Sequence, residues 1–120
     1  MLKYTKDHEW LRLDGDVATI GITPFAQEKL GELVFVELPA LTAKLEKGGV
    51  AATVESVKAA SEVYAPVSGE VIDVNSKVSD QPSLINSAPT GDGWLFKVKI
   101  TNAAELDTLL DERAYYAIAK

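Results

Sequence analysis

Proline and glycine divide most of this chain into short segments, which favours many short strands over long helices. All five prolines and all eight glycines lie between Gly15 and Gly93. Several segments alternate apolar with polar residues, as in residues 70–74 and 93–100. An alternation with a period of two is typical of strands that have one buried face. We therefore expect a mainly β protein, with residues 1–120 forming a single domain.

An Asp-Gly pair at residues 14–15 predicts the first hairpin. The pair separates residues 10–13 from residues 16–22, and apolar residues alternate with small or polar ones in both stretches. Asp-Gly suits a two-residue hairpin loop because glycine adopts a positive φ without a steric penalty. The sequence thus predicts an antiparallel pair of strands near the N-terminus.

Two further strands are expected in the middle of the chain. Residues 33–38 are almost continuously apolar and are followed by Pro39, so this strand is expected to end there and to be buried on both faces. Residues 47–49 contain two glycines and predict a turn. Residues 50–55 form the strand expected after that turn.

A short internal helix is expected at residues 25–30. Thr23 provides a side-chain cap, and Pro24 suits the first helical position because its missing N–H has no helical partner there. Gly31 is the type of residue that ends helices. These signals predict one helical segment between the first hairpin and the strand at residues 33–38.

A second helix is expected at the C-terminus. Asn102 followed by Glu105 matches a capping box, in which the glutamate side chain reaches back to the cap. We expect this helix to cover part of the sheet with an apolar face. That face comprises Leu106, Leu109, Leu110, Tyr115, Tyr116 and Ile118.

The composition excludes several classes of function. The chain has no cysteine and only one histidine, His8, which excludes disulfides, thiolate metal sites, catalytic thiols and multi-histidine metal sites. Its formal net charge is −6 and its basic residues are scattered, so nucleic acid is not an expected partner. No apolar run is long enough to cross a membrane, and the N-terminus lacks the apolar stretch of a signal peptide. We expect a cytosolic protein without a metal.

Residues 51–65 do not fit either period. Glu, Lys and Ala dominate the middle of this segment and favour a helix, since no glycine or proline interrupts them. Such a helix would be poorly amphipathic, because its apolar residues form only one thin stripe. The pattern alone leaves the segment open between a short helix with a solvated Lys58 and another structure.

The order of several motifs resembles the glycine cleavage system H protein family. The similarity runs from about Tyr4 to Tyr115, almost the whole chain. Each motif is weak alone, whereas the ordered set is highly specific. The matching segments are residues 4–10, 17–23, 25–31, 34–39, ESVKA at 55–59, YAPVSGEV at 64–71, PSLIN at 82–86 and GDGW at 91–94.

The resemblance implies a lipoyl-type barrel-sandwich hybrid, with a short internal helix and a C-terminal helix. Lys58 would then lie at the tip of a tight β-hairpin and carry lipoic acid as lipoyl-lysine. A lipoate-attaching enzyme would recognise the residues around it, namely Glu55, Ser56, Val57 and Ala59. The resemblance therefore favours the hairpin over the helix that propensity suggests.

The resemblance also implies a monomeric carrier that is not itself an enzyme. In the glycine cleavage system, a pyridoxal-phosphate glycine decarboxylase loads the aminomethyl fragment of glycine onto the lipoyl arm. A tetrahydrofolate-dependent aminomethyltransferase takes the one-carbon unit, and a flavin dihydrolipoamide dehydrogenase reoxidises the arm. The expected location is the bacterial cytoplasm, or the mitochondrion in a eukaryote.

The loaded arm would carry an ammonium group beside sulfur, which water would decompose. A cleft with a carboxylate would exclude water and hold the cation. Glu9 is the first candidate and Glu62 the second, because both match acidic positions of the family pattern. Asp7 is a weaker candidate, and His8 is a possible hydrogen-bond partner near the arm. The alternative is that these are ordinary surface carboxylates and a structural histidine.

Other functions are compatible with parts of this pattern. The main alternative is an H-like lipoyl carrier that serves sulfur oxidation or lipoyl relay. A biotin carrier normally has Met on both sides of the modified lysine, whereas Val57 and Ala59 flank Lys58. A lipoyl domain of a 2-oxoacid dehydrogenase usually has Asp before that lysine. A small enzyme and an interaction module with an unmodified lysine are further alternatives.

Overall fold

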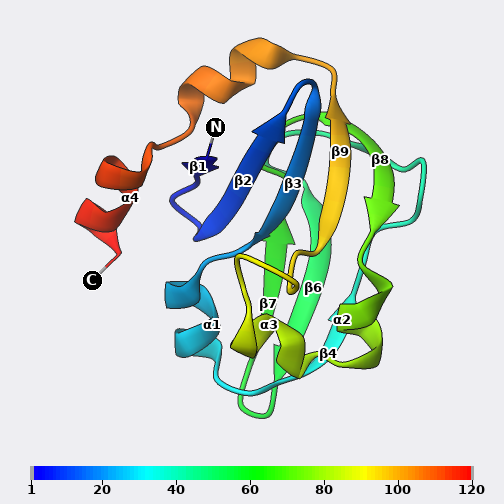
Figure 1. The fold of residues 1–120 in the computed structure, drawn as a ribbon, viewed down its shortest axis with the longest axis vertical. Coiled ribbons are helices and arrows are strands. Elements are labelled where there is room, and N and C mark those ends of the chain that lie inside the picture. The colour runs from blue at the N-terminus through cyan, green and yellow to red at the C-terminus, as the bar shows by residue number, and fades with distance from the viewer. Residues whose placement is uncertain (1, 120) are drawn as a thin grey trace.

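The chain folds into two antiparallel sheets that pack against each other, with short helices around them (Figure 1). The computed structural model describes residues 2–119. The larger sheet has the strand order β1 (Leu2–Tyr4), β2 (Glu9–Asp14), β3 (Val17–Ile22), β9 (Phe96–Ile100), β8 (Gly69–Val74), β5 (Lys44–Leu45). The smaller sheet has the order β4 (Leu33–Glu37), β6 (Val50–Ser56), β7 (Ala60–Tyr64). The helices are α1 (Pro24–Leu30), α2 (Ser76–Asp80), α3 (Ser83–Ser87), the 3-10 helix η1 (Ala103–Thr108) and α4 (Glu112–Ile118).

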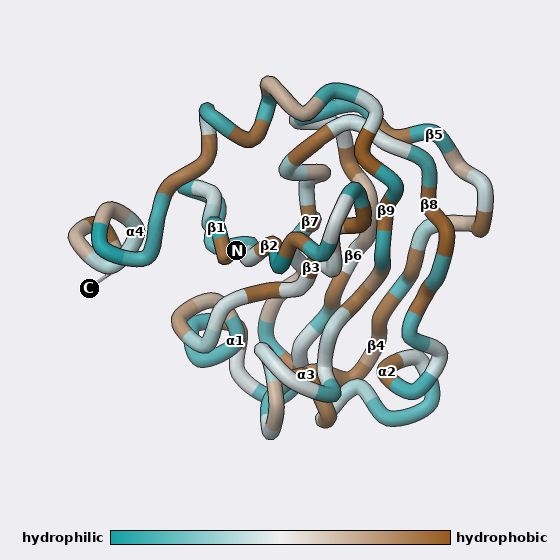
Figure 2. Tube along the Cα trace, turned by 45° about the horizontal axis from the view of Figure 1, so that its top comes forward, coloured by the Kyte–Doolittle hydropathy of each residue, from teal (hydrophilic) through white to brown (hydrophobic). Residues whose placement is uncertain are grey.

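The apolar core lies between the two sheets. Figure 2 shows hydrophobic residues alternating with hydrophilic ones along β9, as a sheet with one buried face requires. Buried side chains come from both sheets, among them Ile20, Val36, Val54, Val63, Val71, Phe96 and Val98. The prediction of a mainly β fold is confirmed. No helix within residues 2–119 is long and apolar enough to cross a membrane.

The first hairpin and the internal helix form where local signals predict them. In the β2–β3 hairpin Asp14 pairs with Val17, and Gly15 has a φ of 64°. Helix α1 begins after Thr23, whose side chain accepts a hydrogen bond from the backbone N–H of Ala26. Gly31 follows α1 with a φ of 84°, in the region that favours glycine.

Strand β4 is not buried on both faces as its apolar sequence predicts. Leu33 and Val36 point into the core, whereas Val34 and Phe35 are 52% and 50% exposed. The register of β4 against β6 shifts between Leu33 and Phe35, and β4 lies at an edge of its sheet. The bulge turns two consecutive side chains outward, so a continuous apolar run does not mean burial here.

The expected C-terminal helix is divided into η1 and α4. Asn102 caps η1 and accepts a hydrogen bond from the backbone N–H of Ala104. The predicted capping box is wrong in its second half, because the Glu105 carboxylate accepts hydrogen bonds from the N–H and the hydroxyl of Ser68, at 2.7 and 2.9 Å. A tertiary contact thus takes the side chain that a local rule assigns to the cap.

Helix α4 packs on β1 mainly through Tyr115, and the ring of Tyr116 also meets that of Tyr4 edge-on, with centroids 5.9 Å apart. Tyr115 is fully buried and its ring stacks on that of Tyr4, with centroids 4.6 Å apart. Tyr116 and Ile118 are exposed, so the prediction that all three continue one apolar face is wrong. Tyr116 points about 100° away from Tyr115 around the helix, and β1 beneath α4 has only three residues.

Three elements after β8 differ from the expected pattern. The sequence pattern does not predict α2 and α3, which are only five residues each. The strand expected at residues 93–100 begins at Phe96, because residues 89–93 form turns and the N–H of Gly93 donates to the carbonyl of Ala88. These turns pack α3 closely against the segment that enters β9.

Candidate functional site

Lys58 lies at the tip of the hairpin that joins β6 to β7. Val54 pairs with Ser61 and Glu55 pairs with Ala60, so the chain reverses over the residues between Glu55 and Ala60. The hairpin expected from the family resemblance is confirmed, and the helix favoured by propensity does not form. Figure 1 shows the tip at the lower end of the molecule, beside the loop that joins α1 to β4.

Ser56 holds the tip without a glycine or an asparagine in the turn. Its backbone N–H donates to the carbonyl of Ala59 at 2.7 Å, and its hydroxyl donates to the same carbonyl at 3.1 Å. The Ser56 Oγ accepts hydrogen bonds from the N–H groups of Ala59 and Lys58, at 3.0 and 3.3 Å. A serine side chain that bonds nearby backbone groups in this way stabilises a tight turn.

The Lys58 side chain is exposed and extends along the α1–β4 loop. A Cβ placed on Gly31 would lie 3.4 Å from the Lys58 Cε, and the N–H of Val57 donates to the carbonyl of Glu32 at 3.2 Å. Lys58 forms no ion pair with any residue in the range 2–119. The arrangement presents a primary amine on a flexible stem above a fixed base, which suits acylation by a partner enzyme.

The outer face of the small sheet, next to the tip, carries acidic and apolar side chains. Glu37 lies opposite Thr53, which lies opposite Glu62 on β7. In the neighbouring row Phe35 lies opposite Glu55, and all three glutamates are exposed. At the tip itself Val57 is 70% exposed. A partner that reaches Lys58 therefore meets a negatively charged surface with exposed apolar groups.

Glu9 is a buried carboxylate that joins the start of β2 to the end of β7. Its side chain is 2% exposed. Oε2 accepts a hydrogen bond from the N–H of Tyr64 and Oε1 accepts one from the hydroxyl of Thr5, both at 2.8 Å. Burial raises the pKa of Glu9 to about 7, because desolvation of the charged form outweighs these two hydrogen bonds, and the nearby Asp7 raises it further.

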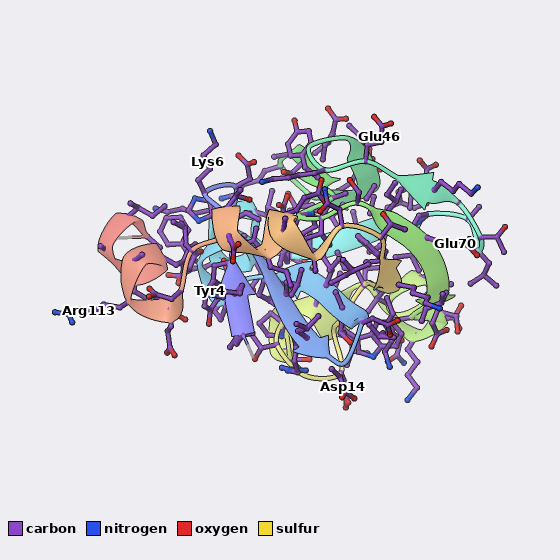
Figure 3. The ribbon with its side chains drawn as sticks, turned by 90° about the horizontal axis from the view of Figure 1, so that it is seen from above. Tyr4, Lys6, Asp14, Glu46, Glu70 and Arg113 are labelled. Atoms are coloured by element: carbon purple, nitrogen blue, oxygen red, sulfur yellow. The ribbon has the colours of Figure 1, made fainter. Side chains whose placement is uncertain are left out.

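Glu9 and Asp7 line the same pocket, which has a volume of about 410 Å³. The pocket lies between the loop before β2, the end of β7 and the segment after η1. Figure 3 shows that Lys6, which also lines it, projects away from the body of the protein. The other lining residues are Thr5, Lys47, Gly48, Tyr64, Ala65, Pro66, Thr108, Leu109 and Leu110.

The other two predicted cleft residues do not line this pocket. Glu62 is exposed on the outer face of β7, between the hairpin tip and Tyr64. His8 has a φ of 69°, and its Nδ1 lies 2.8 Å from the hydroxyl of Tyr115, which lies 2.7 Å from the Thr23 Oγ1. The His8 ring also packs on Phe25, with centroids 4.6 Å apart. These contacts tie α4 to the start of α1.

Sequence reasoning missed the supports of this site. Thr5 and the backbone of Tyr64 hold Glu9 in place. Nothing in the sequence indicates these two contacts, because Tyr64 meets Glu9 only when the two sheets fold together. Gly31 and Glu32 support the hairpin tip. The only sequence feature that marks them is the glycine itself, which also ends α1. The PSLIN motif is part of the family resemblance, but its sequence does not indicate which groups Asn86 contacts.

Comparison with known proteins gives one consistent result. A family model described as "Glycine cleavage H-protein" matches residues 2–120. Proteins named glycine cleavage system H protein are similar over most of their length. The one from Xanthobacter autotrophicus is 60% identical over 114 residues, 95% of this chain and 91% of the relative. The one from Thermotoga maritima is 54% identical over 115 residues, 96% and 93% of the two chains.

A solved structure supports the same relationship. The crystal structure of a glycine cleavage system H protein from Mycobacterium marinum superposes with a TM-score of 0.89 and 38% sequence identity. It covers 97% of this chain and 94% of that one. The two-sheet architecture, with its few short helices, is therefore that of a known solved fold and agrees with the barrel-sandwich hybrid expected above.

Proposed function

The chain belongs to the glycine cleavage H-protein family, and from this membership we propose that Lys58 is the residue to which lipoic acid is attached. The protein is the lipoyl-carrying component that shuttles the aminomethyl group of glycine between enzymes. The observation that carries the assignment of Lys58 is its exposed amine at the tip of a rigid hairpin. When bound, the lipoyl group supplies the dithiolane chemistry.

The residues around Lys58 fit such a group. The hairpin is held by ladder bonds on both sides of β6 and by the Ser56 side chain, so the attachment point is fixed while the lysine stem moves. Glu55 and Val57 are exposed beside Lys58 and accessible to a lipoate-attaching enzyme, as is Ala59. Ser56 acts differently from its neighbours, because it is buried and sets the shape of the turn.

The pocket lined by Glu9 and Asp7 is the proposed shelter for the aminomethyl group. Strand β7 leads from the tip to Tyr64, whose N–H is bound by Glu9. Between Ala60 and Tyr64 this strand covers about 13 Å at roughly 3.3 Å per residue, and a lysine side chain extended by an eight-carbon acyl group would reach along it from the tip. Glu62 lies along this path, and an ammonium group held beside Glu9 would favour the charged form of its carboxylate.

The proposed partners are the enzymes of the same system and a lipoate-attaching enzyme. The specific set comprises glycine decarboxylase, the aminomethyltransferase and dihydrolipoamide dehydrogenase, with the carrier itself catalysing no reaction. The net charge of −6 and the exposed glutamates near the tip favour partners with basic surfaces. A carrier that visits several enzymes in turn requires weak, salt-sensitive association with each of them.

Reconstitution tests the function as a whole. The lipoylated chain, mixed with the three enzymes, glycine, tetrahydrofolate and NAD⁺, is expected to support NADH formation in proportion to its concentration. The matched control is the same chain produced without lipoate, which is expected to give no NADH above background. Full lipoylation without NADH formation would contradict the assignment to glycine cleavage and favour an H-like carrier of another pathway.

A further inference from the structure

The PSLIN motif contains one polar side chain that joins three separate segments. Asn86 lies in α3, and its Oδ1 accepts a hydrogen bond from the N–H of Leu33 at 2.9 Å. Its Nδ2 donates to the carbonyl of Gly31 at 2.8 Å and to the Oε1 of Gln27 at 2.9 Å. The backbone N–H of Leu33 requires an oxygen and the backbone carbonyl of Gly31 requires an N–H, so these two partners fix the orientation of the amide.

The segment that Asn86 holds is the same one that supports the hairpin tip. Gly31 and Leu33 flank Glu32, whose carbonyl accepts the hydrogen bond from the N–H of Val57. Gly31 also lies against the Lys58 side chain, close to its Cε. A continuous chain of contacts thus runs from α3 through residues 31–33 to the tip.

We propose that Asn86 is a positioning residue that sets the approach of Lys58 to the enzyme that modifies it. Asn86 fixes residues 31–33. It thereby keeps the carbonyl of Glu32 available to the N–H of Val57, and it keeps Gly31 in place against the Lys58 side chain. The inference depends on the proposed function, since it assumes that Lys58 is the modified residue. Without Asn86 the tip would be correctly placed for only part of the time, and apparent affinity for the modifying enzyme would fall by that fraction.

Asn75 provides a matched control because it makes the same kinds of bonds elsewhere. Its Nδ2 donates to the carbonyls of Asp92 and Trp94, both at 2.7 Å, and its Oδ1 accepts from the N–H of Lys77 at 3.3 Å. These bonds cap α2 and hold the segment before β9, and none of them involves the segment that supports the tip. Asn75→Asp and Asn86→Asp make the same chemical change, and each removes the two hydrogen bonds that its own side-chain amide donates.

The experiment compares these two variants with the wild type in two measurements. The first is hydrogen exchange at the Val57 amide of the unmodified protein, which reports the bond to Glu32 directly. The second is the kinetics of lipoylation by a purified lipoate-attaching enzyme, followed by mass. Asn86→Asp is expected to increase the Val57 exchange rate at least tenfold and to raise the KM for the protein at least fivefold, with a smaller change in kcat. Asn75→Asp is expected to change neither quantity more than twofold.

The outcomes separate a failure of this inference from a failure of the proposed function. If the wild type is lipoylated at Lys58 and both aspartate variants behave alike, the positioning role of Asn86 is overturned. If the wild type is not lipoylated, the proposed function fails, whereas exchange at Val57 still decides whether Asn86 holds the tip. Should Asn86→Asp not fold, the pair Asn86→Ala and Asn75→Ala gives the same comparison without an added charge.

Discussion

Lys58→Arg is expected to abolish lipoylation and to reduce NADH formation in the reconstituted system to the level measured without the protein. Arginine keeps the positive charge and the length of the side chain, but its guanidinium is not a nucleophilic amine that can be acylated. Lys58 is exposed and forms no ion pair within residues 2–119, so the substitution is expected to leave the free energy of unfolding within about 0.5 kcal/mol of the wild type.

Two controls make the Lys58→Arg result specific. Lys44→Arg changes an exposed lysine in β5, outside the pocket beside Glu9, and is expected to leave lipoylation intact. Urea unfolding of both variants checks that the fold is unchanged. Residual lipoylation of Lys58→Arg at the wild-type rate would show that another lysine carries the group, and the shuttle would have to be assigned to a different site.

Glu9→Gln is expected to change how stability depends on pH. The pKa of Glu9 is about 7 in the folded protein because of burial, above its ordinary value of 4.5. Between these values the folded state binds more protons than the unfolded state, so the free energy of unfolding falls as pH rises. The loss from Glu9 alone amounts to roughly 2 kcal/mol between pH 5.5 and 8.5. Glutamine does not titrate, so the variant lacks this loss.

Urea unfolding of the wild type and Glu9→Gln at pH 5.5 and 8.5 measures this difference. Contributions from all other titrating groups are shared by the two proteins and cancel in the comparison. Glu62→Gln is the control, because Glu62 is exposed on β7. Its stability is expected to follow the wild type at both pH values. Parallel curves for the wild type and Glu9→Gln would contradict the buried, proton-binding state of Glu9.

The same variant tests the proposed shelter for the aminomethyl group. Glu9→Gln is expected to be lipoylated at the wild-type rate, because the Glu9 side chain lies at the far end of β7 from Lys58. The aminomethyl-loaded form is expected to decay faster, since an amide holds an ammonium group less well than a carboxylate. Release of ammonia from the isolated loaded protein measures the decay, and an unchanged lifetime would argue against Glu9.

Local signals predict those parts of the fold in which neighbours along the chain decide the structure. The turn at Asp14-Gly15 and the cap at Thr23 depend on residues within one or two turns, so the first hairpin and α1 are readable from the sequence. Glu105 is a case in which a local signal fails. Its spacing from Asn102 fits a capping box, yet Ser68, 37 residues earlier, takes its carboxylate.

The hairpin that carries Lys58 is a case in which tertiary pairing overrides propensity. Ala, Glu and Lys around Lys58 favour a helix, but β6 is paired on both sides and the Ser56 side chain closes the turn. Only the resemblance to a known family predicted this. The resemblance predicted that Glu9 and Asp7 belong to a cleft. It did not predict the contact between Glu9 and Tyr64, because these residues are 55 positions apart and meet only in the folded chain.

Peptide mass mapping of the wild-type protein, produced in cells that make lipoate, tests the central assignment most directly. The account predicts an added mass of about 188 Da, as expected for an amide-linked lipoyl group, on the peptide that contains Lys58 and on no other lysine. An unmodified Lys58, or the same added mass on a different lysine, would contradict it.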